Sequence, residues 1–327
     1  MARGLQRIVE ETGLSLATVS RALNDSDKVT AKTKAIVLEA AQRIGYSPNA
    51  AARALVTRRN YTIGAVIPTL ESSIFSTFIH AIEDTLIPSG YALVIATTDN
   101  DPDIEEQRAR DLFKMGAEGL IVSGLQHNDS FFEFLDTHQI PAIATSIYRE
   151  QASLPTIGYD NEALGHQAAT YLAGLRHRNI GLIHGPTPNN DRTRLRIAGV
   201  QSVYPDARLC EVPLTVEGGV EACKSLLSGD QPPSAILCLS DVLALGVLFE
   251  APRMGVSIPD QLSVMGFDDL EWASVSNPPL TTISLPVVAM GQDSATALIR
   301  KLEDGTNIQS QCLTSSIIER RSTRKLN

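Results

Sequence analysis

Residues 15–24, with the sequence Ser-Leu-Ala-Thr-Val-Ser-Arg-Ala-Leu-Asn, place one long cation among short polar side chains at helical spacing. A guanidinium such as that of Arg21 is able to form two parallel hydrogen bonds with the edge of a guanine base. Thr18, Ser20 and Asn24 are short donors of the kind that contact phosphates and fix the register of a protein on DNA. The pattern is typical of a helix that reads double-stranded DNA, and the alternative is an ordinary helical hairpin with Arg21 in solvent.

A second group of chemically capable residues follows apolar runs farther along the chain. Asp241 follows the run 235–239, and Asp268 and Asp269 follow the run 262–267. Ligands of open parallel sheets bind beyond the carboxyl ends of the strands. Carboxylates there accept hydrogen bonds from hydroxyl groups, and Arg196 adds a guanidinium that can bind two neighbouring oxygens. Trp272, the only tryptophan, has an aromatic face that could stack on a sugar ring.

Each of these residues also has a purely structural interpretation. Asp241 could cap the helix that begins at residue 242, and Asp268 could form a turn. Arg196 could pair with a carboxylate between two subdomains. Trp272 could belong to the core or to a dimer contact. The sequence leaves both interpretations open at each position.

Three short helices are needed to position the residues around Arg21. Gly13 permits a sharp turn before Ser15, and both Ser15 and Thr30 are good N-caps. Gly45 ends the third helix. Apolar residues at helical spacing predict the inward faces of the three helices: Leu5, Ile8, Val9 and Thr12; Val19, Ala22 and Leu23; and Ile36, Val37, Ala40, Ala41 and Ile44. We therefore predict a compact headpiece with a helix-turn-helix.

Charge separates this headpiece from the rest of the chain. The chain of 327 residues has a net charge of −9, which by itself argues against a nucleic-acid partner. Residues 1–60 nevertheless carry ten Lys/Arg and five Asp/Glu, a charge of +5, and the remainder carries −14. A basic headpiece on an acidic body is expected when only the N-terminal part meets phosphates.

From Tyr61 onward, short apolar runs alternate with helical patterns. The predicted strands cover 63–67, 92–97, 119–122, 142–147, 180–184, 209–214, 235–239, 262–266 and 282–285. The predicted helices cover 74–88, 103–115, 130–138, 161–174, 192–203, 218–228, 241–254 and 287–303. This alternation predicts parallel sheets covered by helices. Two similar halves are favoured, the second beginning near Ile180, with the strand 282–285 and the helix from Val287 crossing back to the first.

Several protein classes are disfavoured. No apolar run is long enough to span a bilayer, and the first residues lack the apolar stretch of a signal peptide. The four cysteines are widely spaced, as expected of reduced thiols in the cytoplasm. The chain contains no GxGxxG after a strand and no GxxxxGK[ST], GxSxG or HExxH. We predict a cytoplasmic protein that is not an enzyme, with no cofactor, metal or membrane.

The segment 47–57 is distinct from both parts. It starts with proline at a natural first helical position and is rich in alanine. A helix of this length is too short to be stable in isolation. We predict a connector that becomes helical only when something packs on it.

Eight motifs in a fixed order identify a family. They are 13–24 (GLSLATVSRALN), 45–55 (GYSPNAAARAL), 63–68 (IGAVIP), 194–199 (RLRIAG), 240–246 (SDVLALG), 264–269 (VMGFDD), 278–283 (PPLTTI) and 321–323 (RST). Together they resemble the lac repressor/galactose repressor family of bacterial transcription regulators over essentially the full length. The resemblance implies a helix-turn-helix domain at 1–46, a hinge helix and linker at 47–60, and a core at 61–327 like that of periplasmic sugar-binding proteins. Within the core, the N-subdomain would comprise about 61–160 and part of 287–327, and the C-subdomain about 161–286.

The resemblance also implies DNA contacts. In this family the hinge helices of a dimer enter the minor groove and wedge a leucine between base pairs, which here is Leu55. Leu16 and Ala17 stand at the usual base-reading positions, although neither can form side-chain hydrogen bonds. The implied DNA-contacting residues are Ser15, Leu16, Ala17, Thr18, Ser20, Arg21, Asn24, Tyr46, Asn49, Ala52, Arg53 and Leu55.

The implied partners are palindromic operator DNA, a second copy of the chain, and a small-molecule effector that controls repression. The effector is expected to be a sugar, sugar acid or sugar phosphate bound between the two subdomains, by Phe75, Ser146, Arg196, Asp241, Asp268 and Trp272.

Two positions depart from relatives: Ser146 stands where some have an acidic residue, and Leu214 where others have an aromatic one. His184 and Arg192 could suit an acidic or phosphorylated ligand. No C-terminal heptad segment follows residue 323, so a dimer is expected rather than a tetramer.

Overall fold

The computed structural model describes residues 2–23, 28–46 and 59–327, and it divides the chain into two units, Met1–Tyr61 and Thr62–Asn327. Asn24 and residues 47–58 lie outside the described residues. The predicted hinge helix, with Asn49, Ala52, Arg53 and Leu55, therefore lies outside them almost entirely.

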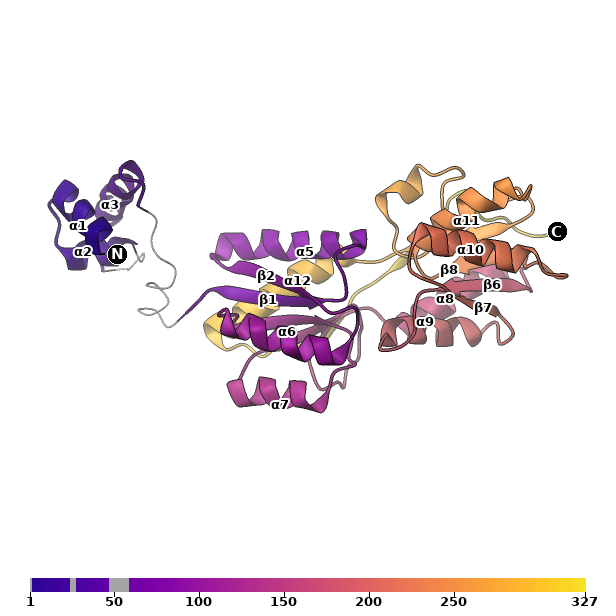
Figure 1. Cartoon of the computed structure of the whole chain (residues 1–327), viewed down its shortest axis with the longest axis horizontal. Helices are drawn as coiled ribbons and strands as arrows, with labels where there is room; N and C mark the ends of the chain where they lie inside the picture. Colours follow the sequence, from indigo (N-terminus) through magenta and orange to yellow (C-terminus); the bar gives the residue numbers. More distant parts are fainter. Residues whose placement is uncertain (1, 24–27, 47–58) are drawn as a thin grey trace. The chain divides into compact units, whose positions relative to one another are not determined.

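The headpiece consists of α1 (Ala2–Thr12), α2 (Leu16–Leu23) and α3 (Ala31–Arg43) (Figure 1). The side chain of Thr30 accepts a hydrogen bond from Thr33 N, and Ser15 Oγ accepts one from Thr18 N at 3.2 Å. Both predicted N-caps are therefore confirmed. The fully buried side chains of this small core are Ile8, Val19, Ala22, Val37, Ala40 and Ala41.

One residue that was predicted to lie in the core of the headpiece is exposed instead. Ile36 is 43% exposed, so the inward stripe of α3 begins at Val37. Position 36 precedes the 37, 40, 41 and 44 repeat by one residue, which turns its side chain about 100° away from the core. Tyr46 instead packs on α1, where a side-chain carbon at Gly4 would lie 2.5 Å from its ring.

The first half of the core, the N-subdomain, is built around a six-stranded parallel sheet in the order β11-β5-β4-β3-β1-β2. Its strands are β1 (Thr62–Ile67), β2 (Ala92–Thr97), β3 (Gly119–Ser123), β4 (Ala142–Thr145), β5 (Thr156–Gly158) and β11 (Gln311–Cys312). Helices α5 (Ser73–Leu86) and α12 (Val287–Asp304) pack together on one face. Helices α6 (Pro102–Lys114) and α7 (Asp129–His138) cover the other (Figure 1). A short 3-10 helix, η1 (Ile87–Ser89), follows α5.

The second half, the C-subdomain, has a four-stranded parallel sheet in the order β7-β6-β8-β9. Its strands are β6 (Ile180–His184), β7 (Arg208–Glu211), β8 (Ala235–Cys238) and β9 (Ser263–Met265). Helices α8 (Asn161–Gly174) and α9 (Asp191–Gln201) pack as one pair, and α10 (Val216–Leu227) and α11 (Asp241–Arg253) as another. The 3-10 helix η2 (Glu271–Ser274) completes this half.

The chain passes between the two halves three times. It crosses after β5 into α8, after β10 (Thr282–Ser284) into α12, and after β11 into β12 (Ser316–Ile318), which pairs antiparallel with β10. The tail then stays on the C-subdomain, where Ser322 O accepts a hydrogen bond from Val264 N. The predicted return of the helix from Val287 to the first half is confirmed by its packing on α5. The predicted return of the strand before it is wrong, because β10 pairs with β12 and does not join the six-stranded sheet.

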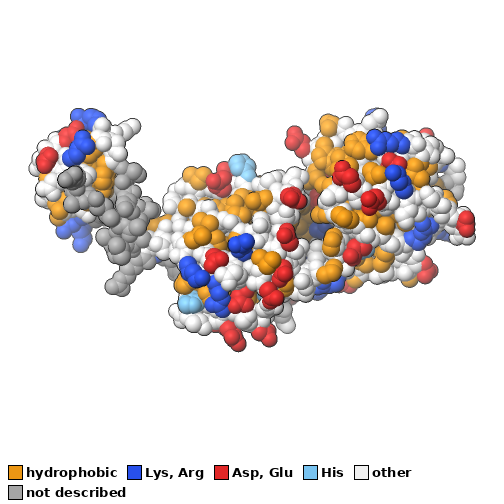
Figure 2. Space-filling view, viewed as in Figure 1, with side chains coloured by type: hydrophobic (Ala, Val, Ile, Leu, Met, Phe, Trp, Pro, Cys, Tyr) orange, Lys and Arg blue, Asp and Glu red, His pale blue; other side chains and the backbone are white. Residues whose placement is uncertain are grey.

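The doubly wound architecture predicted from the alternation is confirmed, including all eight helices of the core to within a few residues. Three strands escaped prediction: β5, β11 and β12. Each has only two or three residues, which is too short for a periodic signal. Acidic side chains are spread over the visible face of the core, in keeping with its negative charge, and that face is indented between the two halves (Figure 2).

Candidate effector cavity and DNA-reading helix

A cavity of about 280 Å³ lies between the two subdomains. It is lined by residues that lie one to three positions after strands of both sheets: Pro68 after β1, Asn100 after β2, Ser146 after β4, Gly185 after β6, Ser240 after β8 and Asp268 after β9. In parallel sheets the carboxyl ends of the strands meet at one edge. The two sheets turn these edges toward one another, so six loops from both halves reach a single volume.

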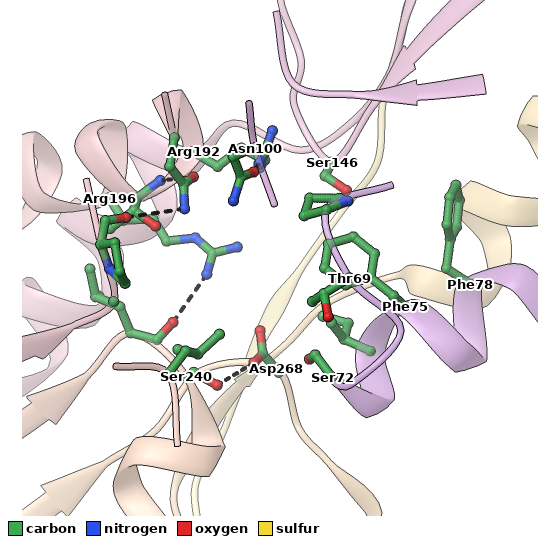
Figure 3. Close-up of a pocket in the computed structure, with 18 of the residues that line it drawn as sticks. Thr69, Ser72, Phe75, Phe78, Asn100, Ser146, Arg192, Arg196, Ser240 and Asp268 are labelled. Atoms are coloured by element: carbon green, nitrogen blue, oxygen red, sulfur yellow. Dashed lines mark hydrogen bonds between the residues drawn. The ribbon is translucent and has the colours of Figure 1, made fainter. Parts of the chain in front are cut away.

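Arg196 contributes the main cation of the cavity from α9. The side chain is buried, with Nε donating to Asn161 Oδ1 at 2.8 Å and Nη1 to Leu239 O at 3.2 Å. Its guanidinium lies 4.1 Å from the centre of the Phe267 ring. Figure 3 shows the end of the guanidinium pointing into the open space of the cavity. Arg196 is therefore fixed by neutral partners and presents hydrogen-bond donors to a ligand.

Asp268 contributes the main acceptor from the loop after β9. Ser240 Oγ donates to Asp268 Oδ2 at 3.0 Å, and both residues line the cavity (Figure 3). The backbone of Asp268 has a φ of 118°, a region that L-residues rarely adopt and that concentrates at binding sites. Burial raises the pKa of Asp268 to about 7, and Asp241 acts in the same direction, whereas Arg196 opposes the shift.

An apolar wall faces these polar groups. Phe75 and Ile74 line the cavity from α5, and Leu214 lines it from the C-subdomain. The ring of Phe75 stands across the open space from Arg196 (Figure 3). A ligand with hydroxyl groups on one edge and a carbon-rich face on the other would match this arrangement. Phe75 and Leu214 offer the apolar surface, and Arg196 and Asp268 the hydrogen bonds.

Ser146 lies at the N-subdomain side of the cavity and connects to Arg196 through Asn161. Asn161 Nδ2 donates to Ser146 O at 2.9 Å, while its Oδ1 accepts from Arg196. Ser146 has a φ of 63°, so this strand end turns sharply. Of the six predicted effector residues, the structure brings four to the cavity: Phe75, Ser146, Arg196 and Asp268.

Several cavity residues escaped the predicted site. Asn100, Tyr159, Asn190 and Ser240 line the cavity and were not predicted, whereas Arg192, which also lines it, was named only for an acidic or phosphorylated ligand. Asn100 and Ser240 follow strands in the same way as Asp268. The expectation that ligands bind beyond the carboxyl ends of strands could therefore have found them as well. Arg192 is buried, and its Nη2 donates to Asn100 Oδ1 at 2.5 Å. His184 is buried but does not line the cavity, and its Nδ1 lies 2.8 Å from Gly185 O.

The exposed face of α2 carries the predicted base-reading residues. Leu16 is 53% exposed, and Ser15, Ala17 and Arg21 are also exposed. Thr18 and Ser20 are half-buried, and Thr18 Oγ1 lies 2.8 Å from Ser15 Oγ at the cap. With Val19 and Ala22 turned into the core, the opposite side of the helix presents a small surface with a single cation. Such a surface can enter a major groove without obstruction.

Family models match both parts of the chain. Residues 5–49 match the family described as bacterial regulatory proteins, lacI family, and residues 169–323 match the periplasmic binding protein-like domain. The chain is 30% identical to the HTH-type transcriptional repressor CytR of Escherichia coli strain K12, covering 99% of this chain and 97% of that protein. This chain belongs to the LacI family. It is also 27% identical to the repressor PurR of Haemophilus influenzae, over 98% of this chain and 99% of the relative.

Solved structures share the fold of this LacI-family chain. The lac repressor dimer bound to operator and the anti-inducer ONPF matches with a TM-score of 0.85 and 26% identity, over 97% of this chain and 98% of that one. A LacI-family protein from Silicibacter pomeroyi matches with a TM-score of 0.86 and 24% identity, over 98% and 99%. The relatives are transcriptional repressors, so this family member is a regulator and not an enzyme.

Two kinds of feature are absent from the described part of the chain. No helix there combines the length and apolar character needed to cross a bilayer. The same residues contain no group of three or more His, Cys, Asp or Glu side chains placed to hold a metal ion.

Asp241 is a correction to the predicted site. It does not line the cavity and is fully buried. Thr282 Oγ1 donates to Oδ1 at 2.7 Å, and Leu270 N donates to Oδ2 at 2.8 Å. The absence of a side chain at Gly266 makes room for this carboxylate, since a Cβ there would lie 2.0 Å from Asp241 Oδ1. The cap of α11 is Ser240, so Asp241 neither lines the cavity nor caps the helix, but joins the start of α11 to β10 and to the loop after β9.

Replacing Asp241 with alanine is expected to lower the free energy of unfolding by about 3 kcal/mol, because the buried Thr282 hydroxyl and Leu270 N–H lose their acceptors. Asp241→Asn should cost less than about 1 kcal/mol, since an amide keeps one acceptor and the hydroxyl of Thr282 can accept from its NH₂. Urea denaturation followed by Trp272 fluorescence measures both. Equal stability of the alanine variant and the wild type would refute this assignment.

Trp272 is the second correction. It lies in η2 and packs, partly buried, against the core of the C-subdomain, and it does not line the cavity. The 3-10 turn starts after Leu270, whose N–H donates to Asp241, and its Trp272 side chain packs on the apolar core of the C-subdomain. The structural interpretation of Trp272 therefore holds, rather than stacking on a sugar ring.

Proposed function

We propose that this LacI-family protein is a repressor whose affinity for a palindromic operator is controlled by a hydroxyl-rich small molecule bound in the cavity. The observation that carries the proposal is the convergence of Arg196 and Asp268 on one side of a cavity between two subdomains with Phe75 opposite. The same chain carries a helix-turn-helix with an exposed arginine. The protein would act as a homodimer in the cytoplasm.

Operator reading would combine direct contacts with contacts that set position. Arg21 would bind a guanine, and Leu16 and Ala17 would allow close approach or contact thymine methyl groups. Ser15, Thr18, Ser20, Asn24 and Tyr46 would lie near phosphates. Asn49, Ala52 and Arg53 would flank Leu55 as it wedges into the minor groove. The lac repressor, 26% identical, is bound to its operator as a dimer, which supports this mode.

The effector is proposed to be a sugar or a sugar derivative. Arg196 supplies donors held by neutral partners, and Asp268 and Ser240 supply acceptors, so the cavity matches neighbouring hydroxyl groups. Leu214 and Phe75 fit the carbon-rich face of a ring. Ligand and operator would bias one equilibrium between two arrangements of the core, and their effects on each other's affinity would be equal.

The decisive experiment has two stages. A thermal-shift screen of sugars, sugar acids, sugar phosphates and nucleosides identifies the effector, because a ligand raises the melting temperature by mass action. Selection from random double-stranded DNA then yields the operator, and titrating the effector against the protein–operator complex gives the sign of the switch. If selection enriches no sequence, the operator function is wrong. If a saturating ligand leaves operator affinity unchanged, the effector control is wrong.

Effector affinity is expected to depend on pH because burial raises the pKa of Asp268 to about 7. A hydroxyl that donates to this carboxylate binds the ionised form, so binding requires proton release below pH 7. Affinity should therefore be about tenfold weaker at pH 6 than at pH 8. Calorimetric titration at pH 6, 7 and 8 measures this, with Asp268→Asn as the variant that should bind weakly but without pH dependence. A flat profile in the wild type would exclude the role of Asp268.

A further inference from the structure

One side of the cavity is crossed by a set of hydrogen bonds between the subdomains. Asp191 Oδ2, at the start of α9 in the C-subdomain, accepts from Leu125 N in the N-subdomain at 2.7 Å. Arg192 Nη2 reaches Asn100 Oδ1 at 2.5 Å. Farther out, Arg194 Nη2 donates to Gln126 Oε1 at 2.5 Å, and Gln126 Nε2 donates to Asn189 Oδ1 at 3.1 Å. We call these residues the α9 clasp.

The inner half of the α9 clasp is shielded from water. The side chains of Asp191 and Arg192 are only 16% and 10% exposed, and they pair at 3.3 Å between Asp191 Oδ1 and Arg192 Nη1. Charged hydrogen bonds that are shielded in this way are stronger than exposed ones and costly to leave unmade. Gln126, Asn189 and Arg194 are exposed and contribute less. Most of the free energy with which the α9 clasp holds the two subdomains together should therefore come from Asp191 and Arg192.

Gly124 explains how the two subdomains approach so closely. Its backbone is left-handed, with a φ of 81°, and a Cβ there would lie 2.1 Å from Arg192 Nη1 and 2.7 Å from Asp191 Oδ1. Any side chain at residue 124 would occupy the position of the guanidinium. Because a guanidinium is the flexible end of a long side chain, it would be pushed aside without disturbing the strand. Gly124 is not among the residues that line the cavity.

The other side of the cavity is open. A groove of about 200 Å³ shares Ile74, Asp268 and Val287 with the cavity and is otherwise lined by residues of both subdomains, among them Thr77, Leu270 and Ala289. The cavity is thus bridged on the α9 side and accessible on the side of α5 and α12. Any opening of the cavity about the crossing segments would therefore have to break the α9 clasp.

We propose that the α9 clasp holds the two subdomains together and positions Arg192 in the cavity wall, and that Gly124 is the residue that allows it to form. In this role the α9 clasp regulates the proposed effector site, and its biological meaning rests on the proposed function. Its test uses neither effector nor DNA, so its failure and that of the proposed function are distinguishable.

The test measures the distance between the subdomains in the full-length protein by double electron–electron resonance. Spin labels are placed at Arg108→Cys on α6 and Glu221→Cys on α10, both exposed, after replacing the exposed Cys312 with serine. Labelled protein is mixed with an excess of unlabelled protein, so that distances between chains do not contribute. Gly124→Ala is compared with Gly90→Ala, which has a similar φ of 74° but no atom within 4 Å of the added carbon.

The wild type and Gly90→Ala should share one narrow distance distribution, and Gly124→Ala should give a longer and broader one. Asp191→Ala, which removes the acceptor without adding bulk, should give the same longer distribution. Hydrogen exchange in the peptide containing Leu125 should be about tenfold faster in both clasp variants, while exchange in β6 stays unchanged and shows that the fold is intact. The inference is overturned if both clasp variants keep the wild-type distribution, or if Gly90→Ala opens to the same extent as Gly124→Ala.

Discussion

Arg196→Gln is expected to weaken effector binding by about 100-fold while leaving operator affinity in the absence of effector near that of the wild type. The guanidinium is held by Asn161 and Leu239 O and stacked on Phe267, and its end faces the cavity. A charged hydrogen bond contributes about 1.5–3 kcal/mol, and glutamine cannot bind two neighbouring oxygens as a guanidinium does. The repressor would then bind its operator but no longer respond to the effector.

Calorimetry with the effector found by the thermal-shift screen, together with operator titration, measures both affinities. Arg178→Gln is the matched control, since it removes an exposed arginine of the same subdomain that does not line the cavity. Arg196→Lys should recover only a minor part of the affinity, because an ammonium lacks the planar geometry of the guanidinium. Wild-type effector affinity in Arg196→Gln would show that the ligand binds elsewhere.

Arg21→Ala is expected to weaken operator binding by about 10- to 100-fold and to relax the preference for one base pair in each half-site. Arg21 is the only cation on the exposed face of α2, where Leu16 and Ala17 form no side-chain hydrogen bonds. The loss should therefore be concentrated at a single position. Effector affinity should remain unchanged, since Arg21 belongs to the other unit of the chain.

Binding measured on a panel of operators with single base changes separates base reading from general attraction. Arg43→Ala, which removes an exposed headpiece cation paired with Glu11, should reduce affinity for all sequences alike. If Arg21→Ala also reduces affinity uniformly across the panel, Arg21 contacts phosphate, and specificity resides outside α2. The hinge around Leu55 would then be the next segment to test.

Local patterns in the chain were sufficient for the helix-turn-helix and for the doubly wound core. Ser15 and Thr30 were recognisable as caps because capping depends on neighbours only a few residues away. The expectation that ligands bind beyond the carboxyl ends of strands identified Asp268, and it would also have identified Asn100 and Ser240. It could not separate Asp268 from Asp241, because both follow strands of the same sheet and both are acidic.

The amino-acid sequence by itself determined the order of elements, the basic headpiece, the family and most of the polar residues at the strand ends, since these depend on composition and on short-range periodicity. Only the tertiary structure decided which of those residues share a cavity. Asp241 is turned into the core by Thr282 and Leu270 N, and Arg192 is brought across to Asn100 beside Gly124. These contacts join residues 29 to 92 positions apart, and their geometry is set by how two sheets pack and cross, which no local pattern records.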